Sequence, residues 1–189
     1  LERDPARQAI QPGMLVNTPT GSQCTGGFIF DGTGTQTGRH YLGLAAHCVD
    51  DAIGGEVKDA FGTTFGRVAF SVWPYGDYSE DYAFVEIDPA HYGRVDPGLA
   101  GHPDIPTGVV PAGVGAAGDR IQLSGWGFAT AGKQATREER VSFLKSHNEQ
   151  FWFGWGIVSN TDSGGPVVHL PTGGALGSVS NYCVPLPLD

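Results

Sequence analysis

Glycine and proline punctuate the whole chain, and their distribution limits the fold more than any other feature. The 189 residues include 30 glycines and 13 prolines, spread between short apolar runs instead of gathered in one segment. Short runs that end in turn residues are typical of an all-β domain. Apolar residues make up 40% and charged residues 16% of the chain, a balance that argues against disorder and against a coiled coil. We therefore expect about ten short strands in a barrel or sandwich.

The expected strands form two groups on either side of a segment, 97–118, that is rich in glycine, proline and alanine. The first group is 14–16, 28–30, 41–46, 63–72 and 82–87. The second group is 121–126, 141–144, 151–158, 165–170 and 175–179. The run 137–145 also contains helix formers, but its alternation favours a strand. We expect residues 1–105 to hold a lead-in and a first barrel, and residues 106–189 a second barrel.

The charge balance limits the partners. Eleven basic and 20 acidic residues give a net charge of −9, which argues against a nucleic-acid partner. No apolar stretch is long enough to cross a membrane, so we expect no membrane partner. The chain begins at Leu1 without a methionine or a signal peptide, which suggests a processed product.

A serine between an acid and two glycines, in the segment Thr161–Pro166, is the best candidate nucleophile. On a tight turn, Ser163 can have an exposed hydroxyl beside converging backbone N–H groups, which suits an oxyanion hole. A serine also needs a base, and His47 directly follows the apolar run 41–46. The base in turn needs a carboxylate, and Asp81 opens the alternating run that follows it. The predicted constellation is therefore His47, Asp81 and Ser163.

Each of these residues also has an ordinary structural interpretation. Asp-Ser-Gly alone is more often a turn, and a lone histidine is more often structural. Asp77, Glu80 and Asp88 compete with Asp81, but none of them opens the apolar strand. The other histidines are assigned to structure or surface: His40, His91, His102, His147 and His169.

Taken together, these segments resemble the trypsin- and chymotrypsin-like serine peptidases, in which the order is also histidine, aspartate, serine. Ala-Ala-His-Cys at 45–48 and Asp-Ser-Gly-Gly-Pro at 162–166 resemble the two main motifs of that family. Gly-Trp-Gly at 125–127 and Cys-Thr-Gly-Gly at 24–27 resemble two further landmarks. The resemblance implies an all-β fold of two packed antiparallel six-stranded β-barrels, with the active site in the cleft between them.

The resemblance also implies a chemistry. The chain would be a serine endopeptidase that acts on protein or peptide substrates through an acyl-enzyme, without a metal or organic cofactor. It implies a Cys24–Cys48 disulfide, hence an oxidising compartment and a secreted protein. The few cysteines and short loops resemble those of bacterial members.

One departure from the family concerns the oxyanion hole, which the N–H groups of Thr161 and Ser163 should form. Relatives usually carry glycine where this chain has Thr161. Because a β-branched residue resists a positive φ, the preceding peptide could be turned away in the free protein. The alternative is that Thr161 adopts a compatible negative φ, with nothing lost. The first outcome would favour a rival interpretation, a protease-fold binding or signalling protein with weak or no turnover.

A second departure concerns the substrate pocket, to which the resemblance assigns Ile157, Asn160, Ser180 and Tyr182. Ile157 falls at the pocket base, where an aspartate would select Lys or Arg. Tyr182 falls where a small residue often keeps the pocket open, so we expect a shallow, occluded or aromatic-lined pocket. We therefore expect an uncharged residue on the acyl side of the cleaved bond (P1).

Further departures concern the ends of the chain. No Ile-Val-Gly-Gly-like start exists to pair with Asp162, so Arg120 is our candidate partner. The segment 183–188 resembles neither the strand nor the helix that usually follows Ser180. Two explanations stay open: a natural product with a truncated C-terminal part, or a chain that continues beyond Asp189. Cys183 has then either lost its partner or is a free thiol. A calcium loop over 77–81 has only weak support.

Overall fold

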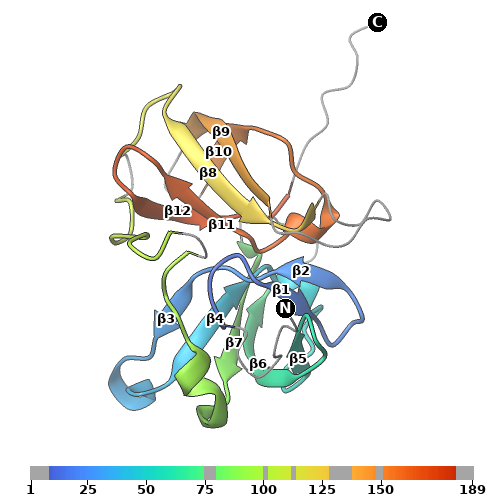
Figure 1. Cartoon of the computed structure of the whole chain (residues 1–189). Helices are drawn as coiled ribbons and strands as arrows, with labels where there is room; N and C mark the ends of the chain where they lie inside the picture. Colours follow the sequence, from blue (N-terminus) through green and yellow to red (C-terminus); the bar gives the residue numbers. More distant parts are fainter. Residues whose placement is uncertain are drawn as a thin grey trace, which may run out of the picture.

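The computed structural model describes residues 9–74, 80–99, 102–111, 114–127, 138–147 and 151–181. Those residues form two curled antiparallel sheets that stack as a lower and an upper lobe in Figure 1. Within the described ranges the helical elements are short 3₁₀ turns, and none is long and apolar enough to span a membrane. The predicted all-β fold with two barrel-like sheets is confirmed.

The first sheet has seven strands in the order β2-β1-β5-β6-β7-β4-β3. In chain order these are β1 (Leu15–Asn17), β2 (Gln23–Thr25), β3 (Ile29–Asp31), β4 (His40–Leu44), β5 (Glu56–Asp59), β6 (Thr64–Val72) and β7 (Tyr82–Ile87). Strand β7 buries Ala83, Val85 and Ile87 and leaves the alternate side chains more exposed, as the period of a strand requires. This alternation packs one face of β7 on the first core, and Asp81 directly precedes the strand.

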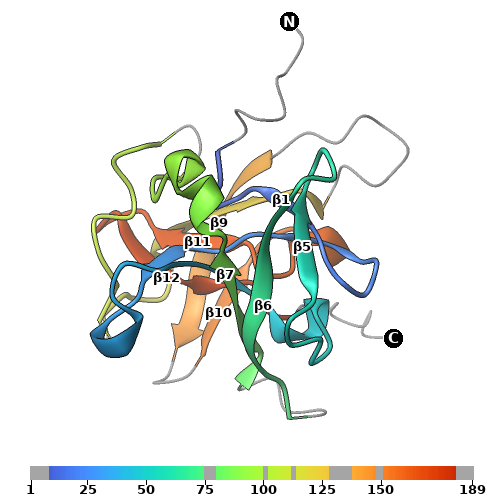
Figure 2. The same ribbon diagram turned by 90° about the horizontal axis from the view of Figure 1, so that it is seen from below.

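The second sheet has five strands in the order β10-β9-β8-β11-β12. They are β8 (Arg120–Gly125), β9 (Glu138–His147), β10 (Trp152–Trp155), β11 (Pro166–His169) and β12 (Gly174–Ser178). The segment 138–147 is a strand, as its alternation predicted. The resemblance implied six strands in each barrel, whereas the described residues divide as seven and five. Figure 2 shows the first sheet in front of the second.

Within the described residues, 3₁₀ turns connect the strands at η2 (Gly34–Gln36), η3 (Ala46–Cys48), η5 (Pro89–Arg94) and η7 (Asn160–Asp162). Two of them matter for the site. Turn η3 follows β4 in the first lobe, and η7 precedes β11 in the second. In Figure 1, η7 is the orange turn beside β2, where the lobes meet.

Each lobe has its own apolar core, and a third cluster joins them. The first core includes Leu42, Phe65 and Ile87, and the second includes Ile121 and Leu144. The third cluster comprises Phe28, Leu99, Val168 and Ala175, with Ile105 packed against it. Because Leu99 and Ile105 belong to the predicted crossover, that segment packs between the sheets instead of hanging free.

Polar contacts at the junction are close and specific. The indole Nε1 of Trp126, just after β8, donates to the carbonyl of Gly13 at 2.8 Å. Gly164 has φ of +84°, and a Cβ built there would lie 2.5 Å from the carbonyl oxygen of Thr25 and 3.0 Å from the backbone nitrogen of Ala45. The two lobes therefore meet backbone to backbone beside Ser163.

Candidate active site

His47 lies at the centre of η3, which is tied to the neighbouring strand by a disulfide. Cys48 bonds Cys24 of β2, so the predicted pairing is confirmed. Backbone bonds from Cys48 N to Ala45 O and from Val49 N to Ala46 O close the turn. These constraints fix where the His47 backbone leaves β4, and hence where its ring points.

Asp81 binds His47 at two points. The His47 backbone N–H donates to Asp81 Oδ1 at 2.9 Å, and ring Nδ1 lies 2.8 Å from Oδ2. The Ser180 hydroxyl donates to the same Oδ2. Burial alone would raise the pKa of the Asp81 carboxyl, but the hydrogen bonds from the His47 ring, Ser180 and the His47 backbone hold that pKa below its ordinary value. Asp81 is therefore an ionised, buried acceptor.

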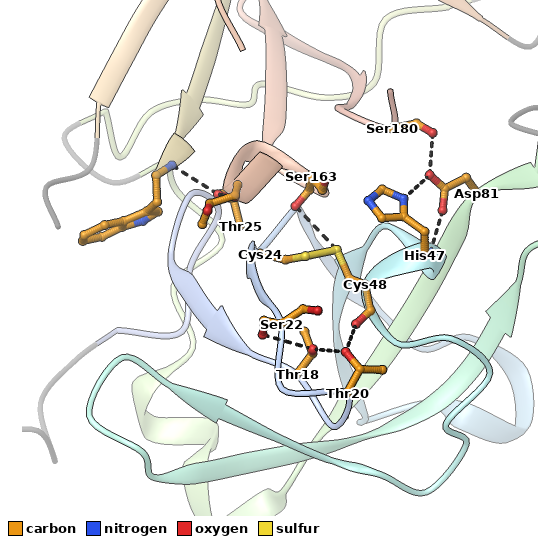
Figure 3. Close-up of a disulfide and its surroundings, with 12 residues drawn as sticks. Thr18, Thr20, Ser22, Cys24, Thr25, His47, Cys48, Asp81, Ser163 and Ser180 are labelled. Atoms are coloured by element: carbon orange, nitrogen blue, oxygen red, sulfur yellow. Dashed lines mark hydrogen bonds and ion pairs between the residues drawn. A yellow bond between two sulfur atoms is a disulfide. The ribbon is translucent and has the colours of Figure 1, made fainter. Parts of the chain in front are cut away.

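This pairing determines which nitrogen of His47 carries the proton. An ionised carboxylate only accepts hydrogen bonds, so Nδ1 must be the donor in the Nδ1–Oδ2 contact. In the neutral ring, Nε2 is then left with a lone pair. Figure 3 shows the ring between Asp81 and Ser163, with the second nitrogen on the side of Ser163. The arrangement leaves a base facing a hydroxyl-bearing residue.

Ser163 follows η7 and is almost buried, with 9% of its surface exposed. Beneath it, fully buried Asp162 accepts from Gly127 N through Oδ1 and from Ser159 N through Oδ2, both at 2.8 Å. A capping box between Ser159 and Asp162 stabilises the turn. A Cβ on Gly127 would overlap Asp162 Oδ2, which explains the glycine of the Gly-Trp-Gly segment.

The partner expected for Asp162 was wrong. Arg120 is exposed at the first position of β8, and the structure contains no ion pair between these two described residues. The carboxylate of Asp162 accepts hydrogen bonds from backbone amides. Such bonds stabilise a buried negative charge, as a nearby cation would. The sequence favoured an arginine because it does not show that the backbone amides of Gly127 and Ser159 converge on the Asp162 carboxylate.

The expected oxyanion hole is not assembled in this conformation. The Ser163 N–H donates to the carbonyl of Asn160 at 3.5 Å, as part of the 3₁₀ turn. In a trans peptide the C=O and N–H point in opposite directions. Since the Asn160 carbonyl faces the Ser163 amide, the Thr161 N–H of that same peptide faces away from it. Thr161 keeps a φ outside the positive region. The first of the two alternatives for Thr161 therefore describes this structure.

A cavity of about 660 Å³ opens beside these groups. Its lining residues are Ser22, Gln23, Cys24, His47, Cys48, Trp73, Asn160, Thr161, Ser163, Ser180 and Asn181. Of the predicted substrate residues, Asn160 and Ser180 line it. Ile157 does not, and its side chain is 66% exposed. Tyr182, Cys183 and most of the suggested calcium loop lie outside the described residues.

Comparison with known proteins rests on structure. No family model matches the chain, and no curated protein matches it in sequence. The solved structure of alpha-lytic protease homolog N4 has a TM-score of 0.54 at 20% identity, covering 93% of this chain and 86% of that one. An inactive form of the Rv3671c protease gives 0.55 at 17%, covering 92% and 78%. A mutant of Rv3671c from M. tuberculosis H37Rv, also inactive, gives 0.55 at 16%, covering 90% and 75%. The fold is chymotrypsin-like.

Within this chymotrypsin-like fold, sequence reasoning missed two contributions to the site. The Trp73 ring meets the His47 ring edge to face, with centroids 6.1 Å apart, and lines the cavity. Ser180 was assigned to substrate binding, whereas its hydroxyl also binds Asp81. Neither residue stands in a recognisable pattern with its partner, so only the three-dimensional structure reveals these contacts. Among the described residues, no cluster of three or more potential metal ligands occurs.

Proposed function

We propose that the chain is a serine endopeptidase. The observation that carries the proposal is the His47 ring, held through Nδ1 by buried Asp81 and presenting Nε2 towards Ser163 at the wall of a cavity. This is the arrangement that turns a weak hydroxyl nucleophile into a reactive one. The likeness to protease structures supports the same reaction class.

The proposed reaction has two halves. Ser163 Oγ attacks the scissile carbonyl carbon while His47 Nε2 takes the hydroxyl proton, and the same nitrogen then gives this proton to the departing amine. The acyl-enzyme remains on Ser163. Water attacks it, losing a proton to Nε2. The ester bond to Ser163 then breaks to release the acid, as Nε2 returns this proton to Ser163 Oγ. Asp81 stays ionised throughout and stabilises the imidazolium.

The oxyanion needs a rearrangement that substrate must drive. The Asn160–Thr161 peptide has to turn over so that the Thr161 N–H joins the Ser163 N–H. The contact to be broken, 3.5 Å between Ser163 N and Asn160 O, is long for a hydrogen bond and therefore weak. The turn moves φ of Thr161 towards positive values, which costs a residue with a Cβ about 1–2 kcal/mol. Turnover would then be slower than a preassembled site allows.

For substrate choice, we propose an uncharged P1 residue. The described lining of the cavity contains amides, hydroxyls and the Trp73 ring, with His47 as its one ionisable side chain besides the disulfide cysteines. A charged P1 side chain would lose its water without gaining a counter-ion among these groups. For location, we propose secretion, which the Cys24–Cys48 disulfide supports.

A second candidate function is a binding or signalling protein on a protease fold. The Asn160 carbonyl that faces the Ser163 amide favours it, because an oxyanion would meet a carbonyl dipole of the wrong sign. In this candidate the cavity holds peptide without cleaving it.

One experiment separates the two candidates. A fluorophosphonate probe is incubated with the wild type and with Ser163→Ala, and the modified residue is located by mass spectrometry. The endopeptidase predicts labelling of Ser163 in the wild type alone, and cleavage of peptides with Ala, Val or Leu at P1 faster than those with Lys or Glu. No labelling and no cleavage, with peptide binding retained, would establish the second candidate.

A further inference from the structure

Thr25 is a fully buried polar residue that no part of the reaction described above uses. It ends β2, directly after Cys24, and has 0% of its surface exposed. A buried hydroxyl needs hydrogen-bond partners, since without them its burial opposes folding. The hydrogen-bond partners of this side chain lie across the lobe junction, in the segments that carry and support Ser163.

Three contacts define its role. The Thr25 hydroxyl donates to the carbonyl of Thr161 at 2.7 Å, because a carbonyl can only accept. The Thr25 hydroxyl oxygen also accepts from the backbone N–H of Trp126 at 3.3 Å. The Thr25 backbone N–H donates to the Ser163 carbonyl at 2.9 Å. In the view of Figure 3, Ser163 lies between Thr25 and the His47 ring.

These contacts hold the segment on both sides of Asp162. Thr25 fixes the carbonyls of Thr161 and Ser163, while Gly127 and Ser159 fix the Asp162 carboxylate. The contact between the carbonyl of the Asn160–Thr161 peptide and Ser163 N is long, at 3.5 Å. The peptide that must turn is therefore bounded at Thr161 by a strong, buried anchor.

The same anchor is linked to the base. Cys24, the neighbour of Thr25, forms the disulfide to Cys48, and Cys48 is the neighbour of His47. A short covalent path thus joins Thr25 in β2 to the residue that faces Ser163. The separation of base and nucleophile depends on this connection, because His47 and Ser163 belong to different lobes.

We infer that Thr25 is a positioning residue for Ser163. The Thr25 hydroxyl, which bonds both Thr161 and Trp126, sets the nucleophile segment at its working distance from His47. The inference rests on the proposed function. A valine at this position would have the same shape but would take the Thr25 hydroxyl from the buried carbonyl of Thr161 and from the part-buried backbone N–H of Trp126. A serine would keep the hydroxyl.

The test compares Thr25→Val with Thr25→Ser and the wild type. Because small displacements of reacting groups are expensive in rate, we expect Thr25→Val to lower kcat and the fluorophosphonate labelling rate by about tenfold or more, with little change in KM. Thr25→Ser should restore most of both rates. Thr172→Val is the control, since its hydroxyl contacts His169 and Gly174 in the second lobe, away from Ser163; it should lose stability without losing kcat.

Hydrogen exchange supplies a readout that does not need turnover. Followed by mass spectrometry, peptides covering residues 159–165 should exchange faster in Thr25→Val, but not in Thr25→Ser or Thr172→Val. Equal labelling and exchange in Thr25→Val and wild type would overturn the inference while leaving the proposed function intact. A wild type that does not label would overturn the proposed function, and exchange would then decide whether Thr25 holds the segment.

Discussion

Thr161 is the residue whose backbone preference has the most influence on the expected rate. In the structure its φ is outside the positive region, and the Asn160 carbonyl faces the Ser163 amide. We predict that Thr161→Gly raises kcat/KM about tenfold, because glycine removes a cost of about 1–2 kcal/mol for the turned peptide. Steady-state cleavage of a peptide with an uncharged P1 residue measures this.

Thr161→Ala is the matched control for that prediction. Alanine removes the β-branch but keeps a Cβ, so it should gain much less than glycine. If glycine and alanine gave the same rate as threonine, the peptide would not need to turn before the chemical step.

Asp81 gives the site a pH-dependent stability. Burial opposes ionisation, but the hydrogen bonds from His47 and Ser180 outweigh it, and the folded pKa lies below the ordinary 3.8. The charged form is therefore favoured by folding, so its contribution is fully present above the unfolded value and is lost as pH falls through the folded one. We predict that the free energy of unfolding of the wild type exceeds that of Asp81→Asn above about pH 5, and that this difference shrinks below about pH 4.

Urea unfolding of both proteins between about pH 2.5 and pH 7 measures this difference. A difference that stayed constant down to the lowest pH would show that the carboxyl does not titrate differently in the folded and unfolded states.

At the scale of single residues, the sequence indicated which side chains form the candidate site better than it indicated how the peptide groups around them are oriented. His47, Asp81 and Ser163 stand in segments whose composition predicts the roles that we propose for them, and the disulfide followed from the resemblance. The direction of the Asn160–Thr161 peptide and the amides around Asp162 are set by three-dimensional hydrogen bonding, which leaves no pattern in the chain. The β-branch of Thr161 was the one local signal of the turned peptide.

Among the elements, β2 and η3 are coupled by the disulfide. Cys24 and Cys48 are 24 residues apart, and on the chain-entropy model a loop of this length contributes about 3 kcal/mol by restricting the unfolded state. We predict that replacing both cysteines by alanine lowers the free energy of unfolding by about this amount. Denaturant unfolding under non-reducing conditions measures it.

Cys183→Ala serves as the control, because it removes a thiol without touching the disulfide. The double variant should also label more slowly at Ser163, since η3 carries His47. Wild-type stability in the double variant would mean that packing alone holds η3 against β2.

The strands that no apolar run predicted are the short polar ones, although the family resemblance had placed 24–27 on a strand. Strand β2 has the sequence Gln-Cys-Thr and β5 has Glu-Val-Lys-Asp, so neither contains an apolar run. They are strands because Val16 of β1 pairs with Cys24 on one side and Asp59 on the other. Pairing with β1 decided their structure, whereas the longer runs that became β4, β6 and β7 carried their own signal.

For the whole molecule, the two-lobe fold was predictable because glycine and proline divide the chain into strands and the crossover separates two groups of them. The expected division at residues 105 and 106 stays a prediction. The packing of the crossover between the sheets was not predictable, since Leu99 and Ile105 are isolated apolar residues in a polar, glycine-rich context. Their partners, Phe28 and Val168, are far away in the sequence.

The absence of a side chain at Gly164 restricts which substitutions the contact between the two lobes can accept. A side chain there would act as a wedge: it would press on the Thr25 carbonyl and the Ala45 backbone at once, and so drive the halves apart. No group that handles protons or substrate would be altered, yet the gap between imidazole and hydroxyl would widen. A substitution of Gly164 would therefore reduce the proposed activity by separating His47 from Ser163, and not by removing a reacting group.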